Sequence, residues 1–533
     1  MLNTCDLGTH VASAALAMLC ASACSDSGAV EVTFLFPEAE ELSPLGEQIA
    51  EVVLIRTAPG TPLQRTQREM AEIGRAIDMG FIEVGEDVRI TAELRSPNQR
   101  LVGYGRSPRT TISPGDTLEI RMHLRKPFLY VTGDTSIAAF DATRDVGEPG
   151  LRRSITAFEQ PAAAVASPDG AHLIVVARDG TTWSLFRLST SDHASIQPES
   201  FALVAGAAEL QASDVAVSDD GRFAVVGFTG DAGGVSVVDL TADPTSSESA
   251  AFTQLGNVTR VNIDGSAPAH ARAHALIDGG RDCTDGPAST IASVALGESA
   301  PDQPPITATG PVSDVAMLPT GSLLAALPCR GEVVIFEPDV APDTPSESLF
   351  AQISGVSAIA VTGDRVWSAG TLPAEVTEPG GENQGARLVL VSSDVAGDDR
   401  ISVELPALQE RARAPAFSDP GEETTRQIDA DNIVAYDLAA VPGNDFVAVL
   451  TRGWFHASAQ GIGPVFPELF VSNREYMLID TATGAVVQRV RTLCELTAGP
   501  AVVGPWECTL APGQLATESA YEPLGIAALY GAR

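Results

Sequence analysis

The sequence of 533 residues predicts an all-β fold, a seven-bladed β-propeller preceded by a small β-sandwich, and three observations support this prediction. A unit made of an apolar run, a tight turn ending in Gly and a second apolar run recurs along the chain. A third apolar run that ends near an acidic residue follows most of these units, and separate strand-like runs precede them. Repetition of strand pairs at a spacing of tens of residues is typical of a β-propeller or a β-solenoid.

Four segments carry the repeated strand pair: Ala163 to Val176, Asp214 to Val226, Asp314 to Ala326 and Asp437 to Leu450. The turn inside the pair is clearest at Ser167 to Gly170, where Ser, Pro, Asp and Gly follow one another. Ser at the first position, Pro at the second and Gly at the fourth are the preferences of a type I turn. Each segment is therefore expected to form a β-hairpin.

The third strand of the repeat carries a family resemblance. Phe128 to Gly133 reads Phe-Leu-Tyr-Val-Thr-Gly and continues to Ala139 to Thr143, and Phe470 to Asn473 continues in the same way to Leu478 to Gly484. These stretches resemble the YVTN-type repeat of WD40-like β-propellers. The resemblance covers about residues 128–533 and implies only the fold of this region.

The repeat spacing favours seven blades, although six or eight also fit because the fourth repeat is irregular. We expect the blades at residues 128–159, 162–205, 213–255, 258–309, 312–353, 356–405 and 432–495. The first blade lacks an inner strand, and the apolar run Leu524 to Tyr530 is an inner strand without a blade. Pairing the two would close a propeller over residues 127–533 and remove the exposed sheet edges.

Residues 28–126 carry strand-like runs separated by turn sequences such as Ser113 to Asp116, which predicts a small Ig-like β-sandwich. Within it, the apolar spacing of Gln64 to Ile77 fits one short helix. Arg125 to Pro127 is the expected junction with the propeller, and its shortness predicts that the two domains touch.

The N-terminus predicts export. Val11 to Ala23 is an apolar run too short to span a membrane and of the length of a signal-peptide core. It ends in small residues before Cys24, and a polar stretch follows, an arrangement that resembles a bacterial lipoprotein cleavage site. Residues 1–24 are therefore predicted to be a lipoprotein-type signal region, with an acylated Cys24 anchoring an outer-membrane or periplasmic lipoprotein. Ordinary cleavage nearby, giving a secreted protein, is the alternative.

Four cysteines remain after the N-terminal region, and they allow three pairings. Cys283 and Cys329 both follow second strands of adjacent blades, and Cys494 and Cys508 bracket a short loop. We expect disulfides within these two pairs, as suits an exported protein. Their spacing matches no zinc pattern.

The formal net charge of −36 argues against nucleic acid as a partner, because a strong negative field repels phosphate backbones. Cations and basic surfaces remain compatible. A protein, a peptide or a glycan of the envelope or the exterior is the expected partner.

The long insertions of the repeat fall between second and third strands or between blades, which places them on one face. They are Asp278 to Pro287, Thr371 to Gly385, Pro406 to Asp431 and Arg452 to Arg474. Long loops without secondary structure are often functional. The last of them carries the candidate ligand-binding residues Trp454, Phe455, His456, Phe466, Glu468 and Phe470. Clustered surface aromatics are typical binding anchors, although they also fit a role in covering the blade edge.

A second candidate site lies at the start of the inner strands. Asp214, Asp314 and Asp437 occupy equivalent repeat positions and are expected to meet at the channel mouth, where carboxylates suit Ca²⁺. An Asp there can equally bond to backbone, and Ala163 and Ala358 leave the ring incomplete. The common catalytic motifs are absent from the sequence. The main hypothesis is therefore a non-catalytic binding propeller without a cofactor, and a metal-dependent hydrolase or lactonase is the alternative.

Overall fold

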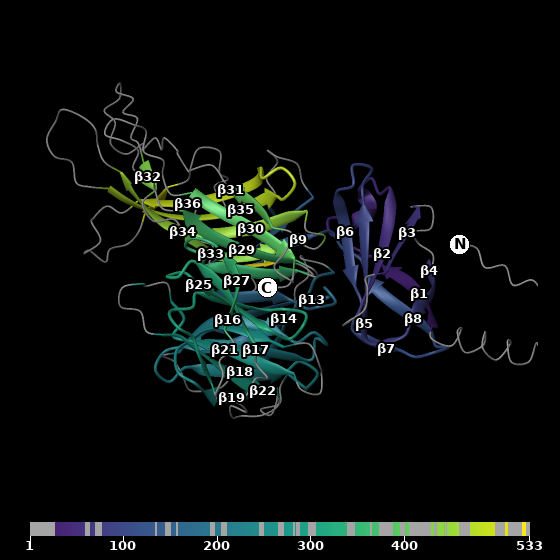
Figure 1. Ribbon diagram of the computed structural model, residues 1–533, viewed down its shortest axis with the longest axis horizontal. Coiled ribbons are helices and arrows are strands. Elements are labelled where there is room, and N and C mark those ends of the chain that lie inside the picture. The colour runs from purple at the N-terminus through teal and green to yellow at the C-terminus, as the bar shows by residue number, and fades with distance from the viewer. Residues whose placement is uncertain are drawn as a thin grey trace, which may run out of the picture.

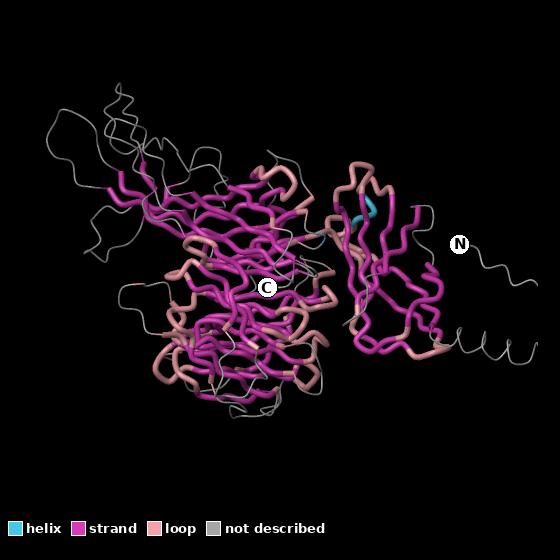
Figure 2. Tube along the Cα trace, in the orientation of Figure 1, coloured by secondary structure: helices cyan, strands magenta, loops and turns pink. Residues whose placement is uncertain are grey.

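The computed structural model shows a small β-sandwich beside a ring of seven sheets (Figures 1 and 2). The structure describes residues 27–58, 64–69, 77–133, 136–143, 151–155, 158–191, 198–203, 210–244, 250–264, 271–280, 283, 288–296, 305–337, 347–362, 365–372, 387–394, 400–404, 428–430, 434–441, 443, 445–457, 469–495, 507–509 and 525–528. Over these ranges the only helical element is the 3-10 turn η1 (Pro44–Gly46). The predicted all-β class is confirmed.

The sandwich consists of a three-stranded and a five-stranded sheet around one apolar core. The first sheet has the order β4 (Ile77–Glu83), β1 (Ser27–Leu35), β8 (Thr117–His123), and the second has the order β3 (Gln64–Glu69), β2 (Glu51–Thr57), β5 (Gly85–Arg95), β6 (Leu101–Arg106), with β7 (Thr110–Ile112) also paired to β5. Val88, Ile90, Ala92 and Leu94 of β5 are fully buried in this core. Since side chains alternate along a strand, the charged residues between them face the other way.

The helix predicted over Gln64 to Ile77 is wrong for the residues that the structure describes, and residues 70–76 lie outside them. Residues Gln64 to Glu69 form β3, which pairs antiparallel with β2 along its whole length. β3 lies at the edge of its sheet, and all six of its residues are polar. Pairing with β2 therefore overrides the weak helical spacing of this segment.

Six of the seven propeller sheets are four-stranded, and the seventh has six strands. Blade one is β38 (Gly525–Ala528), β9 (Phe128–Thr132), β10 (Ile137–Asp141), β11 (Leu151–Ile155). Blade two is β12 (Glu159–Ala166), β13 (His172–Asp179), β14 (Thr182–Ser189), β15 (Glu199–Ala202), and blade three is β16 (Gln211–Val217), β17 (Phe223–Thr229), β18 (Gly234–Asp239), β19 (Ala250–Gln254). Blade four is β20 (Val258–Ile263), β21 (Arg272–Ile277), β22 (Thr290–Ala295), β23 (Ile306–Thr307).

The remaining blades follow in chain order. Blade five is β24 (Asp314–Met317), β25 (Leu323–Leu327), β26 (Glu332–Phe336), β27 (Ser348–Gln352), and blade six is β28 (Ala358–Thr362), β29 (Arg365–Leu372), β30 (Arg387–Asp394), β31 (Ile401–Glu404). Blade seven is β33 (Val434–Ala440), β34 (Phe446–Ala457), β35 (Leu469–Asp480), β36 (Val486–Glu495), with β32 (Ile428–Ala430) and β37 (Glu507–Thr509) added at its outer end. The structure therefore has seven blades.

The two ends of the propeller sequence meet in blade one. Gly525 to Ala528 pair antiparallel with Leu129 to Thr132, so β38 supplies the inner strand that the N-terminal part of this blade lacks. The pairing closes the ring and leaves no open sheet edge between the first and last blades.

The Gly-ended turns have the conformation that their sequence predicts. In the turn at Ser167, the N–H of Gly170 donates to the Ser167 carbonyl at 2.8 Å, and Gly170 has φ 65°. The hydroxyl of Ser167 donates to Asp169 Oδ1 at 2.6 Å, which fixes the side chains of the turn. The turn of blade three repeats these contacts with Ser218, Asp220 and Gly221. A positive φ favours Gly at the last position of each turn.

The sandwich docks on the propeller face that carries these turns (Figure 1). The main-chain N–H of Leu101 donates to Asp445 Oδ2 at 2.9 Å, at the turn of blade seven. Nε of Arg125 donates to Thr190 Oγ1 at 2.9 Å in blade two, and Arg109 pairs with Asp219 in blade three. The turn face is thus partly covered by the other domain.

Candidate functional site

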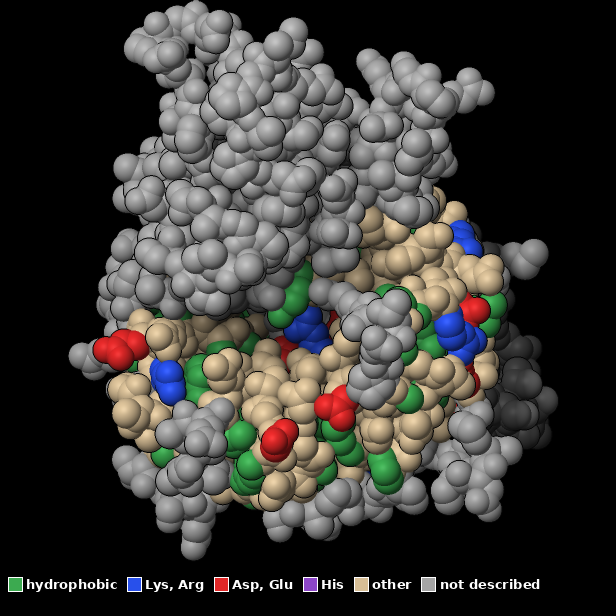
Figure 3. Space-filling view, turned by 90° about the vertical axis from the view of Figure 1, so that its left-hand side faces the viewer, with side chains coloured by type: hydrophobic (Ala, Val, Ile, Leu, Met, Phe, Trp, Pro, Cys, Tyr) green, Lys and Arg blue, Asp and Glu red, His purple; other side chains and the backbone are tan. Residues whose placement is uncertain are grey.

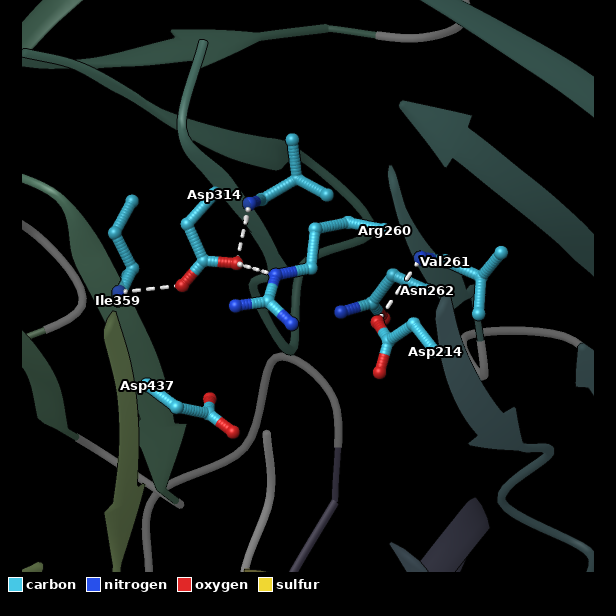
Figure 4. A pocket seen from close by; sticks show the side chains of 8 residues that line it. Asp214, Arg260, Val261, Asn262, Asp314, Ile359 and Asp437 are labelled. Carbon is cyan, nitrogen blue, oxygen red and sulfur yellow. Dashed lines mark hydrogen bonds and ion pairs between the residues drawn. The ribbon is translucent and has the colours of Figure 1, made fainter. Parts of the chain in front are cut away.

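Three aspartates lie at one end of the central channel. Asp214, Asp314 and Asp437 occupy equivalent register positions in the inner strands of blades three, five and seven. They are 2%, 6% and 4% exposed, and all three line one pocket (Figure 4). The structure therefore brings together the three carboxylates that the repeat pattern assigned to the channel mouth.

Arg260 occupies the equivalent position in blade four and extends among the carboxylates (Figure 4). Its Nε lies 3.4 Å from Oδ1 of Asp314, and its Nη2 donates a hydrogen bond of 3.0 Å to the carbonyl of Tyr436. Burial opposes the charge of Arg260, but Asp314, Asp437 and Asp214 together raise its pKa above the ordinary value. The sequence pattern did not point to Arg260, which is the cation of the cluster.

Backbone N–H groups of the following blade also bind the carboxylates. Oδ2 of Asp214 accepts a hydrogen bond of 3.1 Å from the N–H of Val261 in blade four. Oδ2 of Asp314 accepts one of 2.8 Å from the N–H of Ile359 in blade six. Each donor is the residue after the equivalent ring position, so each carboxylate links one inner strand to the next.

Oδ1 of Asp314 and Oδ1 of Asp437 bind N–H groups of their own strands, and in both cases the preceding blade has no aspartate at the ring position. Arg260 precedes blade five and Ala358 lies in blade six, and neither side chain accepts a hydrogen bond. In these cases Asp314 Oδ1 accepts from its own neighbour Val315, and Asp437 Oδ1 accepts from Leu438, both at 3.0 Å. The aspartates therefore act as acceptors for backbone N–H groups of the inner strands, which is a structural role.

The cluster shifts the titration of Asp314. Burial raises its pKa from the ordinary 3.8 to about 6, and Asp437 and Asp214 add to the rise. Arg260 and the N–H of Ile359 act in the opposite direction without cancelling it. The carboxylate excess is thus only partly compensated at neutral pH.

The pocket differs from the expected Ca²⁺ site at its centre, where a guanidinium takes the place of a metal cation. The cavity has a volume of about 10 Å³, close to the least that admits one water molecule. In the ranges that the structure describes, no group of three or more His, Cys, Asp or Glu side chains is arranged to hold a metal ion. The hydrolase alternative, which needs these oxygens as metal ligands, gains no support from this geometry.

The aromatic segment predicted as a loop over Arg452 to Arg474 is largely a hairpin, so this prediction is wrong in part. β34 continues to Ala457 and β35 begins at Leu469, with Trp454 paired to Ser472, Phe455 to Val471 and His456 to Phe470. β32 adds to the outer end of β34. Aromatic residues favour strands, and twelve consecutive strand pairs override the loop signal. Phe466 and Glu468 lie outside the described residues.

The extended hairpin of blade seven projects beyond the ring on the side away from the sandwich (Figure 1). Figure 3 shows this side of the propeller, with basic and acidic side chains at the bottom of a central hollow. The segments joining β21 to β22, β29 to β30 and β31 to β32, which the repeat pattern assigned to the same face, lie largely outside the described residues. We call this side the loop face.

One of the two expected disulfides is present. Cys283, after β21, is bonded to Cys329, after β25, with their Cα atoms 5.2 Å apart. The bond joins blades four and five and confirms this pairing. Cys494 and Cys508 are directly opposite each other in β36 and β37, and their disulfide stays a prediction.

The closed ring of seven antiparallel sheets defines the chain as a β-propeller protein. No protein-family model matches the sequence, and no curated protein matches it. The chain is similar to one in the crystal structure of a nidogen/laminin complex, with 10% identity, a TM-score of 0.33 and coverage of 52% of this chain and 92% of that one. It is also similar to the β-propeller domain of Cps50 (Swd1) from Myceliophteria thermophila, with 10% identity, a TM-score of 0.36 and coverage of 63% and 93%. These similarities are too distant to bear on function.

Proposed function

We propose that the protein is an envelope-anchored, non-catalytic β-propeller of the YVTN type that binds a protein, a peptide or a glycan through its loop face. The observation that carries this proposal is the unequal use of the two faces. The sandwich occupies the turn face through contacts to blades two, three and seven. The opposite face carries the extended hairpin and the disulfide between blades four and five.

The path of blade seven supports this assignment. Asp445 contacts the sandwich at one end of the blade, and β34 runs from Phe446 to Ala457 without interruption. At a rise of about 3.3 Å per residue, a strand of this length spans roughly 35 Å. The hairpin therefore runs from the sandwich side of the ring to the opposite side and extends beyond it. A projecting hairpin of this kind is accessible to a partner.

The N-terminal strand supports the orientation on a membrane. β1 runs parallel to β8, with Ala29 opposite Thr117 and Leu35 opposite His123. β8 leads into the junction with the propeller, so β1 begins at the end of the sandwich farther from that junction. An anchor at Cys24, which lies outside the described residues, would leave the loop face pointing away from the membrane. No helix in the described ranges is long and apolar enough to cross a membrane.

Two measurements test the proposal. Replacing Cys24 with Ala is expected to move the protein from the membrane to the soluble fraction, and unchanged membrane association would contradict the anchor. Capture of partners from envelope extracts is then compared for the wild type, a Trp454→Ala, Phe470→Ala variant and the control Leu349→Ala. Leu349 is 58% exposed on the outer strand of blade five, away from the hairpin. We expect loss of capture only in the hairpin variant, and equal capture by all three proteins would contradict the loop-face assignment.

A further inference from the structure

Three arginines of the sandwich surround one carboxylate of the propeller. Arg109 Nη2 lies 2.7 Å from Oδ2 of Asp219, and Arg89 Nη2 lies 3.5 Å from the same oxygen. Arg106 Nη2 lies 3.9 Å from Oδ1. Asp219 is the second residue of the turn between β16 and β17, the position at which the corresponding turn of blade two has Pro168. The turn itself favours proline at this position, so the conformation of the turn does not require the Asp219 carboxylate.

Positive charge is in excess within this arginine cluster. The side chains of Arg89, Arg106 and Arg109 are only 12%, 15% and 18% exposed. Over the described residues, Nε and Nη2 of Arg89 and Nε of Arg106 are buried without a hydrogen-bond partner. Burial and the neighbouring Arg106 lower the pKa of Arg89 to about 9, even though Asp219 opposes the shift. Buried donors without acceptors are costly, and a second anion beside Asp219 would satisfy those that a small shift of the side chains exposes.

We propose that the arginine cluster binds a small tetrahedral oxyanion of the phosphate or sulfate class, which bridges the sandwich and blade three beside Asp219. A guanidinium group presents paired N–H donors that match the oxygens of such an ion. The three side chains are 12–18% exposed, so a small ion can reach their exposed part, whereas a chain has no comparable access. The net charge of −36 repels polyanions, which favours a free ion over a phosphate within a nucleic acid.

The test is isothermal titration of the full chain with sodium sulfate and, separately, with inorganic phosphate, at constant ionic strength balanced by chloride. The wild type is compared with Arg106→Gln and with the control Arg121→Gln, whose side chain is 71% exposed on β8. Loss of a charge-assisted donor is expected to weaken binding by about tenfold in Arg106→Gln. The Arg121→Gln control should bind like the wild type.

A second variant keeps the proposal testable if Arg106→Gln does not fold. Asp219→Asn removes the anion that competes for the same donors, so it should bind the oxyanion more tightly, by about tenfold. A simple docking role for the cluster predicts no binding of either ion to any form. Absence of binding to the wild type, equal weakening in Arg106→Gln and Arg121→Gln, or weaker binding to Asp219→Asn would each overturn the proposal.

Discussion

The channel cluster and the arginine cluster have opposite charge compositions. In the channel three carboxylates surround the guanidinium of Arg260, and at the domain interface three guanidinium groups surround the carboxylate of Asp219. The channel relieves its excess of acceptors with N–H groups from Val261, Ile359 and Val315. At the interface, Nε and Nη2 of Arg89 and Nε of Arg106 have no hydrogen-bond partner among the described residues. The inner strands can therefore compensate buried carboxylates with their own backbone N–H groups, whereas buried guanidinium groups need an anion from elsewhere.

The largest expected effect comes from removing the cation of the channel. Arg260→Met leaves three buried carboxylates facing one another, and breaking a buried ion pair typically costs about 3–5 kcal/mol in the free energy of unfolding. Denaturant unfolding at pH 7 measures this loss. The control is Arg222→Met, whose side chain is 54% exposed. A cost below about 1 kcal/mol would mean that the backbone N–H groups alone compensate the carboxylates.

The corresponding change at the interface should cost less. Asp219→Ala removes the anion from the arginine cluster, and we expect a loss of about 2 kcal/mol, because the Asp219 side chain is 28% exposed. Burial opposes ionisation of Asp219, but Arg89, Arg106 and Arg109 lower its pKa below the usual range. Its contribution is therefore present above the unfolded pKa and is lost as the pH falls through the lower folded pKa.

Thermal unfolding of Asp219→Ala at pH 7 and at low pH checks both parts of that prediction. Asp231→Ala, a substitution at an exposed position of the same blade, is the control. An equal loss of stability in the two variants would show that the ion pairs between Asp219 and the arginines do not stabilise the folded protein.

Asp314 gives the channel a pH dependence of the opposite sign. Its pKa is raised to about 6 in the folded protein against an ordinary 3.8, so the folded state binds the proton more tightly than the unfolded state. The resulting stability is fully present below the unfolded pKa and is lost as the pH rises through about 6. Asp314→Asn should flatten the dependence of melting temperature on pH between about 4 and 6. If the melting temperature of the variant depended on pH as in the wild type, the dependence would come from groups other than Asp314.

The smallest expected effect on stability comes from removing one arginine of the interface cluster, and it contrasts most clearly with the effect of removing Arg260 from the channel. Arg106→Met removes one of three cations that share a single anion, so in chloride buffer the free energy of unfolding should change by less than about 0.5 kcal/mol. It should also bring the pKa of Arg89 back toward its ordinary value, since Arg106 contributes to the shift. Denaturant unfolding measures the first effect. A loss as large as that of Arg260→Met would contradict the inferred excess of positive charge.

The elements that follow from local chemistry were predictable from the sequence. The Ser167 to Gly170 turn, the closing strand near Gly525 and the bond between Cys283 and Cys329 each depend on residues whose repeat position is visible in the chain. Turn residues have strong positional preferences, and repeats give the register of the blades.

The remaining features depend on tertiary pairing. Arg260 stands in Thr259-Arg260-Val261, the counterpart of Ser213-Asp214-Val215, and follows the same register shift, but its opposite charge conceals the equivalence. The Trp454 hairpin depends on pairing between two strands that a long connection separates, and the sequence does not show how far this pairing extends. The docking of the sandwich depends on Asp219 meeting arginines distant in the sequence, which no local pattern specifies.

The central claim is that a partner binds the loop face, and site-specific photocrosslinking in cells tests it most directly. A photoreactive phenylalanine analogue is placed at Trp454 in the hairpin or at Leu349 on the outer strand of blade five, in the full chain. We predict a discrete crosslinked partner from position 454 and none from position 349. Crosslinking from position 349 alone, equal crosslinking from both positions, or none from position 454 would contradict the claim.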